Sequence, residues 1–198
     1  MYHAHKVLGA PILAMCNAAQ LITTDLNSHL PKPVMHRKSI SMHTDTQEYA
    51  AMVMPVETDF YVVHVQQNTL FAQAGDSTQM HLLHAQWHGI RSLLPPGSVC
   101  RCLVYKDKGN NLCMGIYDLM QIGPKTLHEE GVLQRHILLH HQLHAKQLPH
   151  NIKIHWVGFE KACAQIMLQC RHAQPFECHR ILRLENEAYS YVLAPIQT

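Results

Sequence analysis

The pattern of apolar and polar positions predicts one pair of strands at the centre of the fold. Residues 98–105 (SVCRCLVY) and 112–120 (LCMGIYDLM) are apolar at nearly every position, and residues 106–111 (KDKGNN) between them are typical of a turn. Strands that are apolar throughout, rather than at alternate positions, are covered on both faces. We therefore expect a central hairpin, with Ile116 and Leu119 in the core of its second strand.

The segments before this hairpin are mostly β in pattern. Residues 50–54, 60–65 and 69–74 are predicted strands, and a tight turn at residues 66–68 joins the last two into a hairpin. Residues 79–94 then carry apolar side chains at helical spacing and predict a short helix. The apolar positions of this helix are Leu83, Trp87, Ile90 and Leu94.

Helices and strands alternate after the hairpin. Glu129 and Glu130 predict the start of a helix, because carboxylates are stabilised at a helix N-terminus. Its expected inner stripe consists of Leu133, Ile137, His141 and Leu148. A strand over 152–157, a helix over 159–170 and a last hairpin of 178–184 with 189–193 complete the pattern. The order predicts an α+β fold of mainly antiparallel sheets with flanking helices.

Length and composition fit one domain with an arm. The chain has 198 residues and is 47% hydrophobic, which is enough to bury a core. Pro31, Pro33 and the basic residues 36–38 indicate a boundary, because prolines favour extended backbone. We therefore divide the chain into an N-terminal arm, residues 1–44, and a compact domain, residues 45–198. The formal charge of +2 is too small to predict electrostatic wrapping of nucleic acid.

The arm carries an apolar run, PILAMCNAAQLI (residues 11–22), and no acidic residue before position 25. The run is too short to span a bilayer, so no membrane association is predicted. A mitochondrial presequence is also poor in acidic residues but rich in arginine, whereas here Lys6 and histidines supply the positive character. An intracellular protein is expected, and the mitochondrial and nuclear compartments both stay open.

Cysteine and histidine are frequent but form no standard metal motif. The seven cysteines include no CxxC pair, and we expect buried, reduced thiols. His136, His140 and His144 recur every four residues, a spacing that can bring imidazoles to one metal ion. No HExxH motif or acidic third ligand accompanies them, so a polar outer helix face is the simpler interpretation. We predict neither a metal site nor a cofactor.

Common phosphate-binding and nucleophile motifs are also missing. The sequence contains no GxGxxG, GxxxxGK[ST] or GxSxG string, and Gly109 and Gly123 are isolated turn glycines. A Ser-His-Asp or Cys-His arrangement stays open, because its members are neighbours in space and not in sequence.

Three strings resemble a known family in order and spacing. They are DTQEYAAMVMPVETDFYVVHV (45–65), LLPPGSVCRCLVYKDKGNNLCMGIYDLM (93–120), and PFE (175–177) leading into a hairpin that ends at Pro195. From Asp45 to Pro195 the chain resembles the nucleotidyltransferase-fold domain of ATP-dependent DNA ligases, RNA ligases and mRNA capping guanylyltransferases. It is most similar to the non-catalytic form of that domain, the trimethylguanosine-cap-binding domain of snurportin.

The chain departs from the family's catalytic pattern in four stretches. The family attacks the α-phosphate with the lysine of a K-x-D-G motif, and the corresponding residues 55–60 contain no lysine. The D-G-E motif falls on residues 101–103 without an acid, and E-G-x-V-x-K falls on 177–184 without its glycine and lysine. A final lysine pair is replaced within 191–195. We therefore expect no nucleotidyl transfer by this chain.

The resemblance to a cap-binding domain implies aromatic side chains that stack on a base and basic ones that contact phosphate. The tryptophan expected near residue 192 is missing. The remaining candidates are Tyr61, Tyr117, Trp87 and Trp156 for stacking, and Arg101, Arg180 and Arg183 for phosphate. The alternative interpretation makes the aromatic residues core and the arginines solvent-facing.

Two functional hypotheses follow. The first is a non-catalytic RNA-associated or scaffold subunit of a larger ribonucleoprotein or RNA-processing assembly, with protein subunits as partners and RNA as a further one. The second is a stand-alone module that binds a cap or nucleotide. An active nucleotidyltransferase is disfavoured by the four departures.

Overall fold

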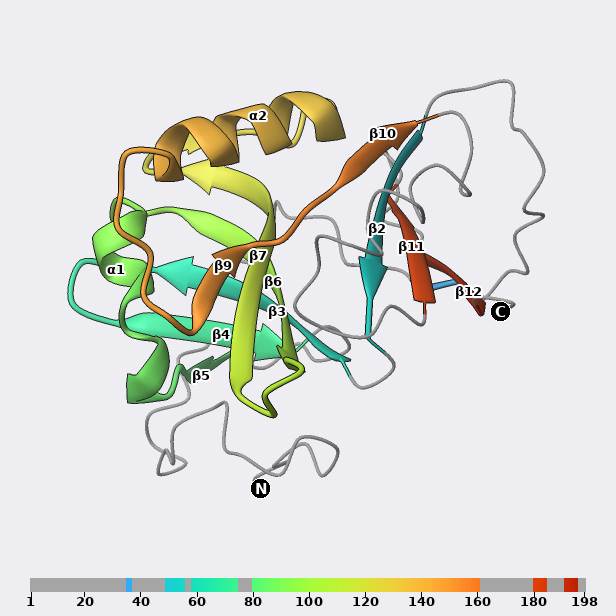
Figure 1. Ribbon diagram of the computed structural model, residues 1–198. Helices are drawn as coiled ribbons and strands as arrows, with labels where there is room; N and C mark the ends of the chain where they lie inside the picture. Colours follow the sequence, from blue (N-terminus) through green and yellow to red (C-terminus); the bar gives the residue numbers. More distant parts are fainter. Residues whose placement is uncertain are drawn as a thin grey trace.

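The protein consists of two mainly antiparallel sheets, one of which carries the helices (Figure 1). The computed structural model describes residues 35–36, 49–55, 58–74, 80–160, 180–184 and 191–195. Every structural statement below concerns these residues. The architecture confirms the predicted α+β fold.

The seven-stranded sheet has the order β5-β4-β3-β6-β7-β8, and β9 also pairs with β7. Its strands are β3 (Thr58–Val65), β4 (Leu70–Ala74), β5 (Met80–Leu82), β6 (Val99–Lys106), β7 (Leu112–Ile122), β8 (Lys125–Thr126) and β9 (Ile152–Ile154). A 3-10 helix (Ala85–Trp87), α1 (Ile90–Leu93) and α2 (Val132–Leu143) belong to this half of the molecule. All its pairings are antiparallel except that of β7 with β9.

The five-stranded sheet has the order β1-β12-β11-β2-β10. Its strands are β1 (Met35–His36), β2 (Tyr49–Met54), β10 (Gly158–Glu160), β11 (Arg180–Leu184) and β12 (Tyr191–Pro195). The antiparallel pairing of β11 with β12 confirms the predicted last hairpin. β1 lies within residues 1–44, predicted as an arm, and pairs in parallel with β12. Residues 1–34 of that arm, including the apolar run, lie outside the described residues.

The predicted central hairpin is confirmed as β6 and β7. The two strands pair along their length, and β3 on one side with β8 and β9 on the other make them internal. Every residue of β6 except Lys106 is buried, as expected for a strand covered on both faces. Ile116 and Leu119 are completely buried in β7. Cys100, Cys102 and Cys113 lie buried in the same hairpin as free thiols, as predicted for these three.

Truncating either core residue of β7 should be costly. Ile116→Ala or Leu119→Ala should lower the free energy of unfolding by about 2–5 kcal/mol, because each change leaves a cavity in a close-packed core. Urea denaturation measures this change. Leu133→Ala is the matched control, because its side chain is 52% exposed, and it should change stability by less than about 0.5 kcal/mol. Parent-like unfolding of both core variants would show that the hairpin is misplaced.

The inner face of α2 differs from the predicted one. Leu133 and Ile137, assigned to the inner stripe, are 52% and 51% exposed, and His141 is exposed too. The buried residues of α2 are instead Val132, Arg135, His136, Leu139 and Leu143. The helix is thus rotated by about one residue from the prediction, or roughly 100°. The buried ion pair of Arg135 with Asp118 places a charged residue on this inner face, beside Val132, Leu139 and Leu143.

Two further predicted elements are corrected. The predicted helix over 79–94 is divided into β5, which pairs with β4, the 3-10 helix and the short α1. Its four apolar residues are nevertheless all buried. The helix predicted from residue 159 does not begin there, because residues 158–160 pair with β2 as β10, and residues 161–170 lie outside the described part.

None of the helices in the described part of the chain has the length and apolar character needed to cross a membrane.

Candidate functional site

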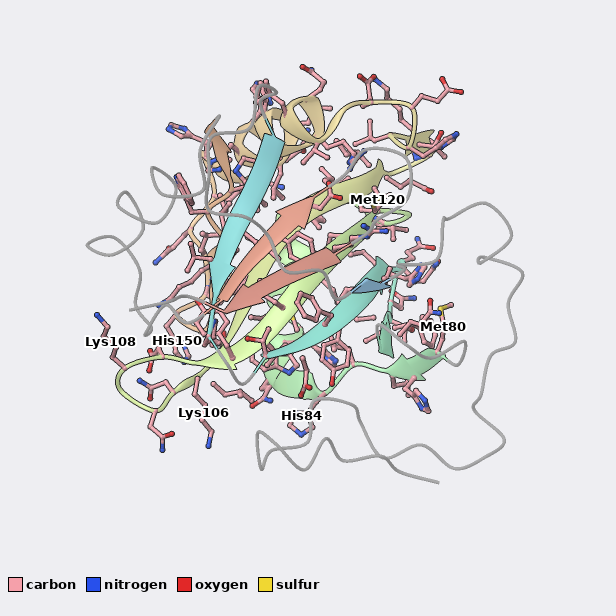
Figure 2. All side chains as sticks on the ribbon, turned by 90° about the vertical axis from the view of Figure 1, so that its right-hand side faces the viewer. Met80, His84, Lys106, Lys108, Met120 and His150 are labelled. Atoms are coloured by element: carbon pink, nitrogen blue, oxygen red, sulfur yellow. The ribbon has the colours of Figure 1, made fainter. Side chains whose placement is uncertain are left out.

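The strands that carry the four motif-equivalent stretches are neighbours in the two sheets. β3 pairs with β6, which places Phe60 opposite Leu103. β11 lies between β2 and β12, so that Arg180 is opposite both Met54 and Pro195. Because β2 ends at Met54 and β3 begins at Thr58, the described parts of these stretches lie near the point where the chain passes from one sheet to the other. Figure 2 shows β2, β11 and β12 in front of the seven-stranded sheet.

Arg101, a candidate phosphate contact, is inside the protein at this junction. It lies in β6 between Val62 of β3 and Asp118 of β7, and only 3% of it is exposed. The β6–β7 register shifts between Arg101 and Cys102, so that Tyr117 is the extra residue of a bulge. Arg101 in the described structure therefore presents almost no surface to a phosphate group.

The neighbouring carboxylate of Asp118 is occupied by an ion pair. Arg135 of α2 donates from Nε to Oδ1 of Asp118 at 2.8 Å and from Nη2 to Oδ2 at 3.2 Å. The same carboxylate accepts the backbone N–H of Leu119 at 2.9 Å. Arg135 Nη1 also donates to the carbonyl of Glu130 at 2.6 Å. This bidentate pair fixes α2 to β7.

The two candidate tyrosines also lie in the interior. Tyr61 in β3 belongs to the main core, and Tyr117 in β7 meets the ring of Phe60 edge-on at a centroid distance of 6.4 Å. Both tyrosines are buried, so that neither ring offers a face to a base in this arrangement. Their position is that of the alternative interpretation, in which they are core residues. A role in nucleotide binding stays a prediction.

Trp156 is the most accessible of the four aromatic candidates. It is partly buried in the segment that runs from β9 to β10, whereas Trp87 is completely buried in the core. Arg180 and Arg183 lie in β11 of the other sheet, opposite Met54 and Ala51 of β2. The structure therefore distributes the seven candidates over the seven-stranded sheet with its 3-10 helix, the five-stranded sheet and the segment that connects the two sheets.

His155 occupies the space between the sheets and was missed by the sequence analysis. It follows β9, and its Nε2 donates to the carbonyl of Val53 in β2 at 2.9 Å. Its ring meets Tyr105 of β6 edge-on, with centroids 6.1 Å apart. Gly115 makes room for it, because a Cβ at that position would lie 3.0 Å from the Cβ of His155. The glycine within an otherwise apolar strand was the available signal for this close approach.

Burial determines the charge of His155. It lowers the pKa of the imidazole from 6.5 to about 4, so that the ring is neutral near pH 7. A carbonyl oxygen only accepts hydrogen bonds, and the proton of the neutral ring is therefore on Nε2. His155 thus joins the sheets as a neutral donor between well-packed side chains.

The β6–β7 hairpin carries Lys106 and Lys108, and the neighbouring β9 carries Lys153. Lys108 is in the β6–β7 turn, whereas Lys106, also assigned to the turn by sequence, is the last residue of β6. Both side chains extend away from the sheet (Figure 2). Lys153 in β9 lies opposite Gly115, and its charge helps to lower the pKa of Asp107, after the larger effect of hydrogen bonds from Asn111.

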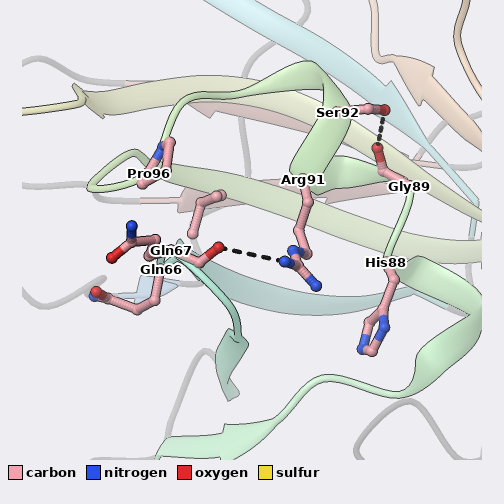
Figure 3. A pocket seen from close by; sticks show the side chains of 8 residues that line it. Gln66, Gln67, His88, Gly89, Arg91, Ser92 and Pro96 are labelled. Carbon is pink, nitrogen blue, oxygen red and sulfur yellow. Dashed lines mark hydrogen bonds between the residues drawn. The ribbon is translucent and has the colours of Figure 1, made fainter.

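An open pocket of about 400 Å³ lies at the opposite end of β3 (Figure 3). Gln66, Gln67, His88 and Arg91 contribute its polar walls, and Arg91 Nη2 donates to the carbonyl of Gln67 at 3.3 Å. The pocket begins at Val65, whereas the motif-equivalent stretch 55–60 ends at Phe60, five residues or about 17 Å earlier along β3. None of the seven candidate residues lines it.

Two of the helix histidines are in direct contact. His136 is buried on the inner face of α2, which corrects its predicted place on a polar outer face. Its Nε2 lies 3.1 Å from Nε2 of His140, and its Nδ1 lies 3.4 Å from the carbonyl oxygen of Tyr117. Within the described ranges, no group of three or more His, Cys, Asp or Glu side chains is placed to hold a metal ion.

Comparison with known proteins identifies the fold. No protein-family model and no curated protein matches the sequence. A solved structure described as mycobacterial DNA ligase D complexed with ATP and MES matches with a TM-score of 0.60 and 13% identity, covering 85% of this chain and 61% of that chain. The ligase domain of M. tuberculosis LigD matches with a TM-score of 0.57 and 10% identity, covering 82% of this chain and 60% of the other.

The chain has a nucleotidyltransferase-like fold. Its length corresponds to about three fifths of the ligase chains, and the low identities show the fold alone. The predicted nucleotidyltransferase fold is thereby confirmed, and the predicted closeness to the cap-binding domain of snurportin stays a prediction.

Proposed function

We propose that this chain is a non-catalytic nucleotidyltransferase-fold protein that acts as an RNA-associated or scaffold subunit of a larger ribonucleoprotein or RNA-processing assembly. The observation that carries the proposal is the junction of the two sheets. The motif-equivalent strands are present there, but residues 55–60 contain no lysine and residues 101–103 no carboxylate. Buried side chains occupy the junction instead, with His155 against Gly115 and Val53.

The electrostatics of the junction support the loss of catalysis. Nucleotidyl transfer requires charged groups aimed at phosphate and metal, in a site that a nucleotide can enter. Here Arg101 is 3% exposed, the carboxylate of Asp118 is paired with Arg135, and His155 is neutral near pH 7. The ion pair holds α2 on β7 and His155 joins the two sheets, so that neither offers a charge to a triphosphate.

A stand-alone cap- or nucleotide-binding module, related to the cap-binding domain of snurportin, is the alternative. The partly exposed Trp156 favours it, because an accessible indole face can stack on a methylated base. Quenching of tryptophan fluorescence by a cap analogue, lost in Trp156→Phe and kept in Trp87→Phe, would support this alternative against the scaffold.

The chain should form no covalent nucleotide adduct, because its motif-equivalent residues 55–60 supply no lysine nucleophile. Incubation with labelled ATP or GTP and Mg²⁺ or Mn²⁺, followed by denaturing electrophoresis, should give no labelled band. A DNA ligase domain of the same fold is the positive control. A band that disappears with Lys106→Met, Lys108→Met or Lys153→Met would disprove the claim.

The subunit role is tested with the chain in its own cells. A tagged full-length chain should co-purify with a fixed set of proteins at constant stoichiometry, and ribonuclease treatment distinguishes association through RNA from association through protein. We also propose that the apolar run anchors the chain to its partners, because such a run can fold on binding a groove. A variant that lacks residues 1–34 but keeps β1 tests this anchor. A monodisperse monomer without partners would contradict the proposal.

A further inference from the structure

His136 and His140 present their ring nitrogens to one another on α2. They are one helical turn apart, the Nε2 atoms are separated by 3.1 Å, and the ring centroids by 4.6 Å. The interplanar angle of 74° keeps the rings from stacking, so that the contact is made through nitrogen atoms. Spacing of i and i+4 on a helix is suited to two ligands of one ion.

The surroundings of His136 prepare its Nε2 for coordination. Nδ1 faces the carbonyl oxygen of Tyr117 at 3.4 Å, which can only accept, so that the proton of the neutral ring belongs on Nδ1. The Nε2 lone pair then points toward His140. A carbonyl behind the distal nitrogen is the usual arrangement of a metal-binding histidine, because it fixes tautomer and orientation.

The distance between the nitrogens fits one ion bound by both. With metal–nitrogen bonds of about 2.0–2.1 Å, two nitrogens 3.1 Å apart subtend about 95–100° at the metal. This angle is larger than the ligand–metal–ligand angle of square-planar or octahedral coordination and smaller than that of tetrahedral coordination. Neutral imidazole nitrogens suit zinc, copper and nickel, and not the hard ions Mg²⁺ and Ca²⁺.

We propose that His136 and His140 bind one divalent first-row transition-metal ion, Cu²⁺, Ni²⁺ or Zn²⁺, through their two Nε2 atoms, with water in the remaining positions. His140 shifts its proton from Nε2 to Nδ1 on binding. Its exposed side chain gives the ion a path from solvent. Because no third protein ligand joins the pair in the described part of the chain, the site is open and the ion exchangeable.

The site is independent of the proposed subunit function. It lies on α2, next to the exposed side chains of Leu133 and Ile137, and uses no residue of the motif-equivalent strands. The proposal also differs from the predicted absence of a metal site. That prediction concerned a site of three histidines with an acidic ligand, whereas the proposed site consists of two histidines and water.

The test uses the full chain and the metal ions alone. Isothermal titration calorimetry with Cu²⁺, Ni²⁺ and Zn²⁺ should detect a site that is at least tenfold weaker in His140→Ala. His141→Ala removes an adjacent, exposed histidine and is the matched control that should bind like the parent. Because position 140 is exposed, the variant should fold normally, which a parent-like melting temperature without metal verifies.

A second readout identifies the ligands. Electron paramagnetic resonance with one equivalent of Cu²⁺ should show two nitrogen ligands in the parent and one fewer in His140→Ala. Metal should also raise the melting temperature of the parent more than that of His140→Ala, because a ligand of the folded state stabilises it. Equal affinity and unchanged spectra for His140→Ala, or an equal loss for His141→Ala, would overturn the proposal.

Discussion

Replacing Arg135 with methionine should lower the free energy of unfolding by about 3–5 kcal/mol, because the change leaves a buried carboxylate without its partner. Arg135 is fully buried, and both oxygens of Asp118 accept from its guanidinium, at 2.8 and 3.2 Å. The side chain of Asp118 is only 5% exposed, so water cannot replace the lost bonds. Denaturation in urea at pH 7 measures the difference.

A double variant distinguishes the uncompensated charge from lost packing. Asp118→Asn removes the charge and keeps an acceptor for the backbone N–H of Leu119, so Arg135→Met combined with Asp118→Asn should recover a large part of the loss. Arg91→Met is the matched control, since Arg91 is exposed and makes one side-chain bond to a carbonyl. If Arg135→Met is no more destabilising than Arg91→Met, the ion pair does not stabilise the attachment of α2.

The central strands could be predicted because a run of consecutive apolar residues indicates a strand that is buried on both faces. β6 and β7 are apolar at nearly every position and are covered on both faces, so that pattern, position in the sheet and burial agree. The turn between them is fixed locally by Asp107, which accepts the backbone N–H groups of Gly109 and Asn111 at 2.9 Å. Residues adjacent in the sequence are therefore sufficient to predict the hairpin and its turn.

The face of α2 could not be predicted in the same way. The buried face has three apolar residues, Val132, Leu139 and Leu143, but Arg135 and His136 lie between them. Arg135 is inside because its partner Asp118, 17 residues earlier, meets it there. A charged residue is excluded from a core only while it lacks a partner. The partner is a property of the folded chain, and periodicity cannot show it.

Prediction of the candidate site was limited because the site depends on strand register and on contacts between residues that are far apart in the sequence. The register shift between Arg101 and Cys102 makes Tyr117 the extra residue of a β-bulge. The local sequence does not predict this shift. His155 contacts Val53, which is 102 positions away. The resemblance in order and spacing found the fold, but residues 55–60 and 101–103 show only what is missing. The side chains that fill the junction required the structure.

Acidification from pH 6.5 to pH 4 should destabilise the protein steeply. Burial lowers the pKa of His64, His136 and His155 from 6.5 to about 4 in the folded state. Between these values the unfolded chain binds protons that the folded chain does not, so stability falls as pH falls. Each histidine contributes up to about 1.4 kcal/mol per pH unit. Asp107, whose lowered pKa starts from 3.8, changes charge below this window.

His64 offers the sharpest test of this pH dependence. Its Nε2 is buried and makes no hydrogen bond within the described residues, so His64→Phe removes one titrating group without breaking a bond there. Urea unfolding at pH 7.5, 6.5, 5.5 and 4.5 measures how the free energy of unfolding depends on pH. In His64→Phe this dependence should be weaker than in the parent by up to about 1.4 kcal/mol per pH unit. His155→Phe should also flatten the slope, but with a loss of stability at pH 7.5, because the bond to Val53 is broken. Parent-like pH dependence in both variants would show that the pKa values of these histidines are not lowered in the folded protein.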